Sequence, residues 1–378
     1  MKKQTFYVVY ALFFIMMMLL GSVYTYSIYR TELEETLNLS TTLSGIPYMV
    51  SLASFAVGMY VFGKYNTLKR AKYLALLGGV IVTVAWIISA VATSIWVIIL
   101  SYGVLMGLAV GILYGMPLMI IQKQDIGKKG LLSGVILFAF GLSSVVFSPV
   151  ARLVIDAYNL STLFYLYALI ASIVTVILFL VIPKMDDAED TMEGPLQTPP
   201  WGKYLFLLTS MSFVGLMMIG LTNVIATTNY SHDPLVIAGF ISIFALLNAL
   251  SRPLFGYLMD RFKFKRLALI SIIMIMVASV INILNQGEIL LLFFIGYGLY
   301  WFNLGVWLTM MPLYVKREVG VDLYAVTYGK VYLGYGISAV IGTLVSSLIL
   351  DQLGNPIYIY GLVMVWMVMM SGYILKRT

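Results

Sequence analysis

The chain has 378 residues, of which 61% are hydrophobic and only 10% are charged, and its mean hydropathy is +0.98. This apolar content exceeds what a water-soluble domain can bury, so it excludes a soluble enzyme or a nucleic-acid-binding module. The sequence has no cysteine and one histidine, His232, and predicts neither disulfides nor a zinc site. The net charge of +7 is a topology signal, because most basic residues fall in short loops between apolar runs.

Twelve apolar runs are each long enough to cross a bilayer as a helix, which takes about 20 residues. Runs such as 82–100 and 267–283 are almost continuously apolar, which is typical of helices and not of alternating barrel strands. We therefore predict an all-α polytopic membrane protein. The predicted spans are 6–28, 44–63, 73–92, 95–121, 130–152, 162–183, 204–229, 235–258, 267–285, 289–314, 324–350 and 355–375.

The basic residues predict the orientation of the bundle. Of the 23 Lys and Arg residues, 19 lie at the termini or in alternate loops on one side. Only Arg30 and Arg152 lie on the other side, while Arg252 and Lys330 fall within spans. The positive-inside rule therefore predicts a multi-pass protein of the cell membrane with both termini in the cytoplasm.

A polar stretch at 184–203 divides the chain in two. It is rich in Asp and Glu and contains the helix breakers Gly194, Pro195, Pro199 and Pro200. This composition predicts a solvated cytoplasmic linker between an N-terminal six-helix half, 1–183, and a C-terminal six-helix half, 204–378. An acidic regulatory segment is the alternative interpretation of this stretch.

The two halves share one register at an offset of 195 residues. Glycines, prolines and polar residues that keep one offset across several spans are not expected from composition, so we interpret the halves as parallel repeats. The matched residues are Tyr102-Gly103 with Tyr297-Gly298, Met116-Pro117-Leu118 with Met311-Pro312-Leu313, and Gly134, Gly141 and Ser143 with Gly329, Gly336 and Ser338.

Two formal charges, on Arg252 and Lys330, lie well inside predicted spans, and no Asp or Glu accompanies them. A charge within the membrane costs at least ~2.5–3.5 kcal/mol on insertion scales, so it normally faces a cavity or a partner. Two cations without a protein anion indicate an anion supplied from outside. Snorkelling to the cytoplasmic interface is the alternative, which the lean of helical side chains disfavours for Arg252 and permits for Lys330.

Two six-helix halves, cytoplasmic termini and a polar linker together resemble the major facilitator superfamily over essentially the whole chain. The superfamily's loop motif is degenerate in the first half, as Gly63-Lys64-Tyr65-Asn66, and better kept in the second, as Gly256-Tyr257-Leu258-Met259-Asp260-Arg261. The resemblance implies the major facilitator fold, with twelve transmembrane helices in two pseudo-repeats. In the superfamily this loop helps to hold the two halves together in the outward-facing state. The resemblance implies that in this chain the second copy of the motif has that role.

Within this superfamily, Gly21-Ser22-Val23-Tyr24-Thr25-Tyr26-Ser27 looks like the Gly-x-x-Tyr-x-Trp-Ser signature of the oxalate/formate antiporter family. Asn248-Ala249-Leu250-Ser251-Arg252 is similar to that family's Asn-x-x-x-Arg, whose arginine binds substrate carboxylate. The related monocarboxylate transporters share the arginine but have an aspartate for proton coupling at the position of Asn248. The second cationic anchor of oxalate exchangers aligns with Tyr335 in this chain, and not with Lys330.

A small carboxylate needs hydrogen-bond donors and walls that exclude water, and aromatic side chains supply both. We expect most of the 27 tyrosines to lie in interfacial belts or in packing. Tyr24, Tyr300 and Trp301 are the better candidates for the cavity. The predicted substrate site therefore consists of Arg252, Lys330, Tyr24, Tyr300, Trp301 and Asn248.

These features predict a secondary active transporter, and not an enzyme, for small organic anions such as oxalate and formate. Exchange of anions is favoured, because an empty site with unpaired cations is costly to occlude. A proton-linked symporter for lactate or pyruvate is the alternative. The expected partners are a small carboxylate and membrane lipid, without nucleic acid, cofactor or metal, and we expect the protein to act as a monomer.

Overall fold

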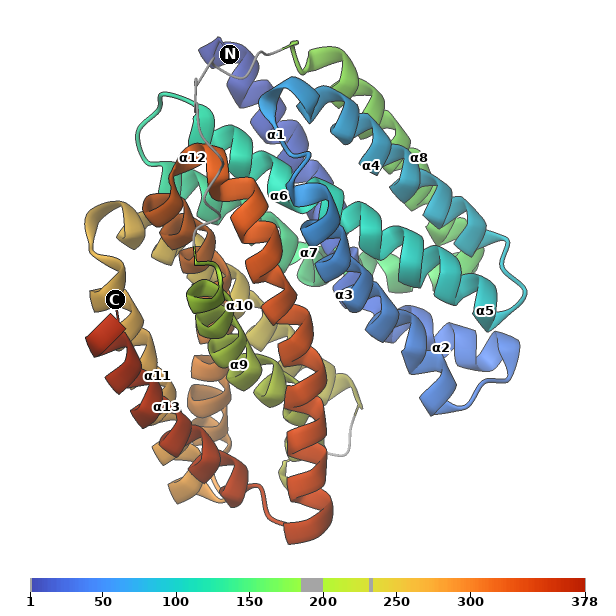
Figure 1. The fold of residues 1–378 in the computed structure, drawn as a ribbon. Helices are drawn as coiled ribbons and strands as arrows, with labels where there is room; N and C mark the ends of the chain where they lie inside the picture. Colours follow the sequence, from blue (N-terminus) through green and yellow to red (C-terminus); the bar gives the residue numbers. More distant parts are fainter. Residues whose placement is uncertain (1, 185–199, 231–233, 378) are drawn as a thin grey trace. The chain divides into compact units, whose positions relative to one another are not determined.

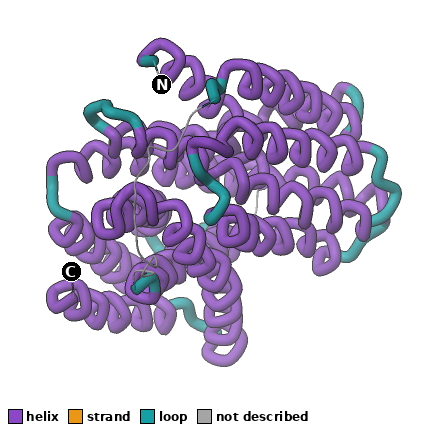
Figure 2. Tube along the Cα trace, turned by 45° about the horizontal axis from the view of Figure 1, so that its top comes forward, coloured by secondary structure: helices purple, strands orange, loops and turns teal. Residues whose placement is uncertain are grey.

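The structure is a computed structural model that describes residues 2–184, 200–230 and 234–377. Within these ranges every regular element is a helix, and short loops connect the helices (Figure 2). The elements are α1 (Lys3–Leu20), η1 (Gly21–Thr25), α2 (Tyr26–Leu37), α3 (Thr41–Gly63), α4 (Leu68–Ala90), α5 (Ile95–Ile98), η2 (Ile99–Met106), α6 (Gly107–Lys123), α7 (Lys129–Ala157), α8 (Leu160–Val181), α9 (Gly202–Asn229), α10 (Pro234–Arg261), α11 (Phe264–Asn285), α12 (Leu290–Leu353) and α13 (Ile357–Arg377).

The described chain contains 11 helical segments that are long and apolar enough to cross a membrane. One of them, α12, has 64 residues, whereas a bilayer needs only about 20. Its backbone is non-helical at Gly320, where φ is 77° and ψ is 175°. The break divides α12 into the predicted tenth and eleventh spans, so the prediction of an all-α protein with twelve transmembrane helices is confirmed.

Two spans contain turns that depart from the α-helix. A 3-10 helix, η1, joins α1 to α2, and a π-helix, η2, joins α5 to α6. Such segments interrupt the regular hydrogen-bond ladder and are frequent at hinges and functional sites. Tyr24, one of the predicted site residues, lies in η1.

The helices form two compact units, which we describe separately. Unit 1 comprises the described residues of Met1–Gly127, Ala139–Trp201 and Val315–Leu333. Unit 2 comprises those of Lys128–Phe138, Gly202–Tyr314 and Gly334–Thr378. In unit 1, α4 packs along α8 and α3 along α6, and in unit 2 α11 packs along α13 (Figure 1). Large apolar side chains such as Leu180 and Leu284 are exposed, as expected of helices that face lipid.

These units differ from the predicted halves, 1–183 and 204–378, in two segments. The start of α7 belongs to unit 2 with the C-terminal helices, and Val315–Leu333 of α12 belongs to unit 1 with the N-terminal helices. Most of the predicted linker, 184–203, lies outside the described residues.

Close helix crossings account for both exchanged segments. A Cβ atom added to Gly130 would lie 2.2 Å from the carbonyl oxygen of Gly256, and one added to Gly329 would lie 2.5 Å from that of Met59. Only glycine permits backbones to approach so closely. The start of α7 therefore packs directly on α10, and the second part of α12 packs directly on α3.

Candidate functional site

Arg252 lies within α10 and is buried, with 1% of its surface exposed. Its Nη1 donates a hydrogen bond to the backbone carbonyl of Leu137 in α7 at 2.7 Å, and its Nη2 donates to Oδ1 of Asn248 at 2.9 Å. Its Nε has no hydrogen-bond partner within the described part of the chain. None of the ion pairs recorded between described residues includes Arg252. The guanidinium is therefore held by neutral groups and retains a free donor.

Asn248 precedes Arg252 by one helical turn, so both side chains lie on the same face of α10. Its Oδ1 accepts from Arg252, while its Nδ2 donates to the backbone carbonyl of Trp301 in α12 at 2.7 Å. The amide oxygen can only accept and the amide nitrogen can only donate, so each end of the Asn248 side chain faces the partner that suits it. Asn248 connects the buried charge to α12.

Trp301 extends this connection to a third helix. Its Nε1 donates to Oγ1 of Thr222 in α9 at 2.8 Å, and its ring stacks on Phe244 of α10 at a centroid distance of 6.0 Å. The hydrogen bonds run from Arg252 through Asn248 and Trp301 to Thr222, and we call these four residues the Arg252 cluster. The cluster fixes the Arg252 side chain relative to α9 and α12.

Glycines bring the neighbouring helices close enough for these contacts. A Cβ atom on Gly134 of α7 would lie 2.3 Å from the carbonyl oxygen of Arg252, and one on Gly305 of α12 would lie 2.1 Å from that of Asn248. Both glycines therefore allow a backbone to touch α10 beside the cluster. This approach places the Leu137 and Trp301 carbonyls within hydrogen-bond distance of α10.

Tyr300 belongs to unit 2 but lies outside the Arg252 cluster. It is fully buried, and its hydroxyl shares a 2.8 Å hydrogen bond with Oγ of Ser279 in α11. Adjacent residues of a helix point about 100° apart, so Tyr300 faces α11 while Trp301 faces α9 and α10. Tyr300 remains a predicted site residue, with its hydroxyl bound to a neutral partner.

The other two predicted residues, Lys330 and Tyr24, belong to unit 1. The ammonium of Lys330 lies 5.8 Å from the centroid of the Trp201 ring. This cation–π contact favours the snorkelling interpretation, because Trp201 lies within the predicted cytoplasmic linker, 184–203. Tyr24 is half-buried, and its ring packs edge-on against Phe140 with centroids 5.4 Å apart.

Sequence reasoning missed two groups: the Leu137 carbonyl, which contacts the cluster, and Thr222, which belongs to it. The Leu137 carbonyl carries no sequence signal, since every residue has a backbone carbonyl. Thr222 is one of several hydroxyl residues in α9, and it is found only because α12 places Trp301 opposite it. The register of the repeats marked Gly134, but not its contact with Arg252.

Asp260 lies in the last turn of α10, in the better kept copy of the loop motif. Its carboxylate accepts hydrogen bonds from the backbone amides of Gly130 and Leu131, at 2.8 and 3.0 Å. These amides belong to the first turn of α7, where a helix presents unpaired N–H groups and a positive dipole end. Asp260 therefore ties the start of α7 to α10, two turns from Arg252.

The chain is similar to known proteins in sequence and in fold. The family model described as Major Facilitator Superfamily matches residues 12–301. The chain is similar to the uncharacterized MFS-type transporter YhjX of Escherichia coli strain K12, with 25% identity over 338 residues that cover 85% of this chain and 82% of the relative. It is also similar to the oxalate:formate antiporter of Oxalobacter formigenes, with 25% identity over 276 residues that cover 68% of this chain and 64% of the relative.

Among solved structures, the fold is similar to that of the proton:xylose symporter XylE bound to 6-bromo-6-deoxy-D-glucose. The TM-score is 0.77, and the match covers 100% of this chain and 96% of the symporter chain. The sequence identity is 12%, so this similarity concerns the fold alone.

Proposed function

Because this chain belongs to the major facilitator superfamily of membrane transporters, we propose that it carries small organic anions across the cell membrane. The substrates are mono- or dicarboxylates such as oxalate and formate, and the mode of transport is exchange by alternating access. Arg252 binds the substrate carboxylate, and Asn248 and Trp301 position Arg252. The protein acts as a monomer with both termini in the cytoplasm.

The observation that carries this proposal is the buried Arg252 guanidinium, which has no carboxylate partner among the described residues. A buried cation is costly unless an anion neutralises it. The planar guanidinium suits a carboxylate, which it binds through two parallel charge-assisted hydrogen bonds. The unpartnered Nε and the neighbouring Nη2, whose hydrogens lie on one edge of the guanidinium, are the donors available for this fork, and Nη2 also donates to Asn248.

Substrate then shares Nη2 with Asn248, while Nη1 keeps its bond to the Leu137 carbonyl. Each Nη carries two hydrogens, so the fork does not require the contact between α7 and α10 to break. The empty carrier contains an uncompensated buried cation, which is costly to occlude, and the bound anion neutralises it. Exchange is therefore favoured over net flux.

The similarity to the oxalate:formate antiporter of Oxalobacter formigenes supports a carboxylate substrate and exchange. The relative and this chain share 25% of residues over the aligned part, so the similarity supports the class of substrate and not its identity.

The test is transport by purified protein in liposomes preloaded with unlabelled oxalate, formate, lactate, pyruvate or malate. We expect uptake of the radiolabelled anion to require an internal anion. Arg252→Gln should lower uptake at least about 30-fold, because removal of one partner of a buried charge pair typically costs 2–5 kcal/mol. Arg152→Gln is the matched control, since Arg152 is half-exposed and pairs with Glu32 and Asp156.

Circular dichroism and gel filtration of each variant establish that it is folded before uptake is compared. Uptake by Arg252→Gln at the wild-type rate would contradict the proposal that Arg252 binds the substrate carboxylate. Uptake that needs no internal anion and rises with an inward proton gradient would instead favour a proton-linked symporter for lactate or pyruvate.

A further inference from the structure

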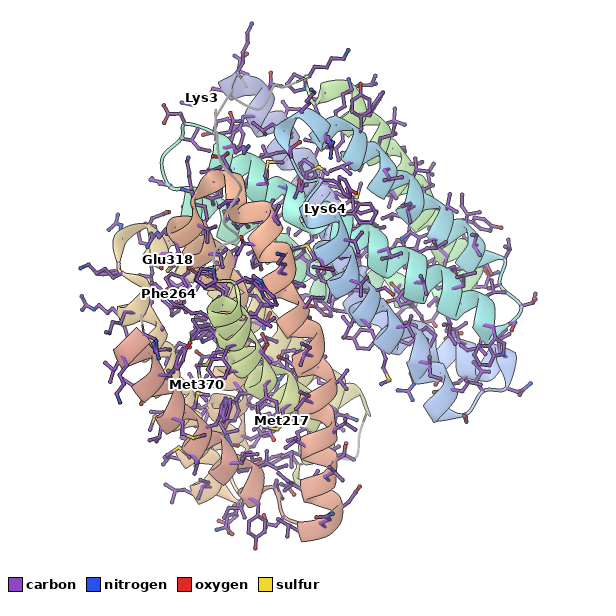
Figure 3. All side chains as sticks on the ribbon, in the orientation of Figure 1. Lys3, Lys64, Met217, Phe264, Glu318 and Met370 are labelled. Carbon is purple, nitrogen blue, oxygen red and sulfur yellow. The ribbon has the colours of Figure 1, made fainter. Side chains whose placement is uncertain are left out.

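Unit 1 contains a cavity of about 960 Å³ that is separate from the Arg252 cluster. The first turn of α1, the loop after α6 and the residues after α8 form its walls. All three belong to the side that is predicted to face the cytoplasm. Lys3 lines this cavity, and Figure 3 shows it at the N-terminal end of α1.

The charged residues that line this cavity are strongly biased towards one sign. Lys2, Lys3, Lys123 and Lys184 line it, with Asp125 as the only acidic residue among the described lining residues. Lys123 also pairs with Asp322 at 3.5 Å. Clustered cations raise the local concentration of anions and repel one another when no anion is bound.

The first turn of α1 adds a second, independent anion-binding feature. This helix has 18 residues, its N-terminus has no side-chain cap, and its first turn has no acidic residue. The amides of its first residues therefore lack intrahelical acceptors, and the helix dipole adds positive potential at the same place. Helix N-termini of this kind bind phosphate groups, and Thr5 of this turn is among the residues that line the cavity.

Apolar groups complete the lining. Phe6, Tyr7 and Leu68 line the cavity on the helices, and Ile126 and Pro183 line it in the loops. A cavity that combines cations with apolar surface suits a phosphate attached to a larger, partly apolar body. A bare inorganic ion would leave much of this volume to water.

We propose that this cavity binds a phosphate-bearing anion through its lysines and the first turn of α1. The phosphate comes either from the head group of an anionic phospholipid in the cytoplasmic leaflet or from a soluble phosphate compound. Basic pockets between transmembrane helices on the cytoplasmic side are suited to such head groups. This site does not include Arg252, so the proposal does not rest on the proposed transport function. A negative result here would leave that function unaffected.

The experiment compares the full-length protein with Lys3→Gln/Lys184→Gln in neutral detergent. The probes are phosphatidylglycerol and inorganic phosphate, each titrated at constant ionic strength. Native mass spectrometry counts bound lipid, and the midpoint of thermal unfolding reports both probes. The matched control is Lys263→Gln/Lys376→Gln, which removes two exposed lysines from helix ends in unit 2.

We expect saturable binding to the wild type and the control, and at least about fivefold weaker binding to Lys3→Gln/Lys184→Gln. Binding of phosphatidylglycerol alone identifies the lipid source, and binding of inorganic phosphate as well identifies a soluble one. Lys3→Arg/Lys184→Arg should restore binding, which separates loss of charge from misfolding. Absence of saturable binding of either probe, or equal affinity of all variants, would overturn the proposal.

Discussion

Asn248 is the residue that leaves the charge of Arg252 uncompensated within the Arg252 cluster. It donates to one helix and accepts from the guanidinium, and it does so without supplying a negative charge. An aspartate at this position would supply the anion from within the protein. The difference between an amide and a carboxylate therefore decides whether the buried guanidinium is left without an anion or is neutralised from within the protein.

We expect Asn248→Asp to raise the half-saturating concentration of the transported anion about tenfold or more, because the new carboxylate pairs with Nη2 and competes with substrate. Uptake at low substrate should rise as the pH is lowered, since protonation removes the competing charge. Radiolabelled uptake across a pH series measures both effects. Asn248→Ala, which removes the hydrogen bonds without adding charge, should show no such pH response; an unchanged affinity of Asn248→Asp at every pH would contradict the prediction.

Glu34 is the ionisable residue whose environment makes stability depend on pH. It lies in α2, outside the membrane-spanning segments, and accepts hydrogen bonds from Ser44 of α3 and from Arg30. The bond from Ser44 is the main cause that lowers the pKa of Glu34 from its ordinary 4.5, desolvation opposes it, and Arg30 lowers it further. The charged form thus joins α2 to α3.

Because the folded pKa of Glu34 is depressed, its contribution to stability is present above pH 4.5 and is lost as the pH falls through the folded value. We expect Glu34→Gln to lower the melting temperature near neutral pH and to have no effect in strong acid. The effect should be modest and should decrease with salt, as the pair is partly exposed. Melting curves across this pH range test the expectation, with exposed Glu35→Gln as control. A constant difference between Glu34→Gln and wild type at all pH values would refute it.

At the scale of the elements, the crossing of α7 and α10 determines the site. Glycines at 130, 134 and 256 allow the two backbones to touch, and Asp260 binds the first turn of α7. This contact gives Arg252 its Leu137 partner. Packing of these two helices is therefore a condition for the cluster and not a separate feature.

Gly134→Val should destabilise the protein by about 1–3 kcal/mol or more, because its Cβ meets backbone atoms of Arg252 and Pro253, which do not move as a side-chain end would. It should also reduce anion exchange, since α7 is pushed away from Arg252. Reversible unfolding in mixed micelles measures the first effect and liposome uptake the second. Gly220→Val is the control: no atom lies within 4 Å of an added Cβ there, so we expect a change within about 0.5 kcal/mol. Equal losses in both variants would mean that the crossing has no special role.

At the scale of the whole molecule, the distribution of basic residues predicts where the two ends lie. Since the natural chain has no cysteine, one introduced cysteine gives a single labelling site. Lys376 lies at the end of α13, and Tyr158 lies in the loop between α7 and α8 with 73% of its surface exposed. These two positions fall on opposite sides of the predicted bundle.

A membrane-impermeant maleimide should label Tyr158→Cys in intact cells and Lys376→Cys only after permeabilisation, because the positive-inside rule places the C-terminus in the cytoplasm. Gel mobility of the labelled protein reads out the result. The cysteine-free wild type is the control for background. Labelling of Lys376→Cys in intact cells would reverse the predicted orientation.

The sequence by itself determined the fold class, the number of spans and which charged residues are energetically costly to place within the membrane. Twelve apolar runs predict twelve spans because lipid offers no hydrogen bonds to a backbone, so each run must be helical. Arg252 was predicted as a site residue because a charge within an apolar run is costly to place in lipid. The connection at 315–323 was predicted as a loop, but it is helical apart from the break at Gly320, since its polar residues carry no strong stop signal before that glycine.

Only the tertiary structure decided what surrounds Arg252. Sequence reasoning grouped it with Asn248, Trp301, Tyr300, Tyr24 and Lys330. Its described contacts include the predicted Asn248, with Trp301 beyond, and add the Leu137 carbonyl and Thr222. Helical periodicity placed Asn248 and Arg252 on one face. The remaining partners come from other helices, and their approach depends on how the glycine surfaces of α7 and α12 fit α10. A hydrophobic pattern specifies that a helix is buried in membrane or protein, but the neighbour it packs against follows from shape complementarity between surfaces that are distant in sequence.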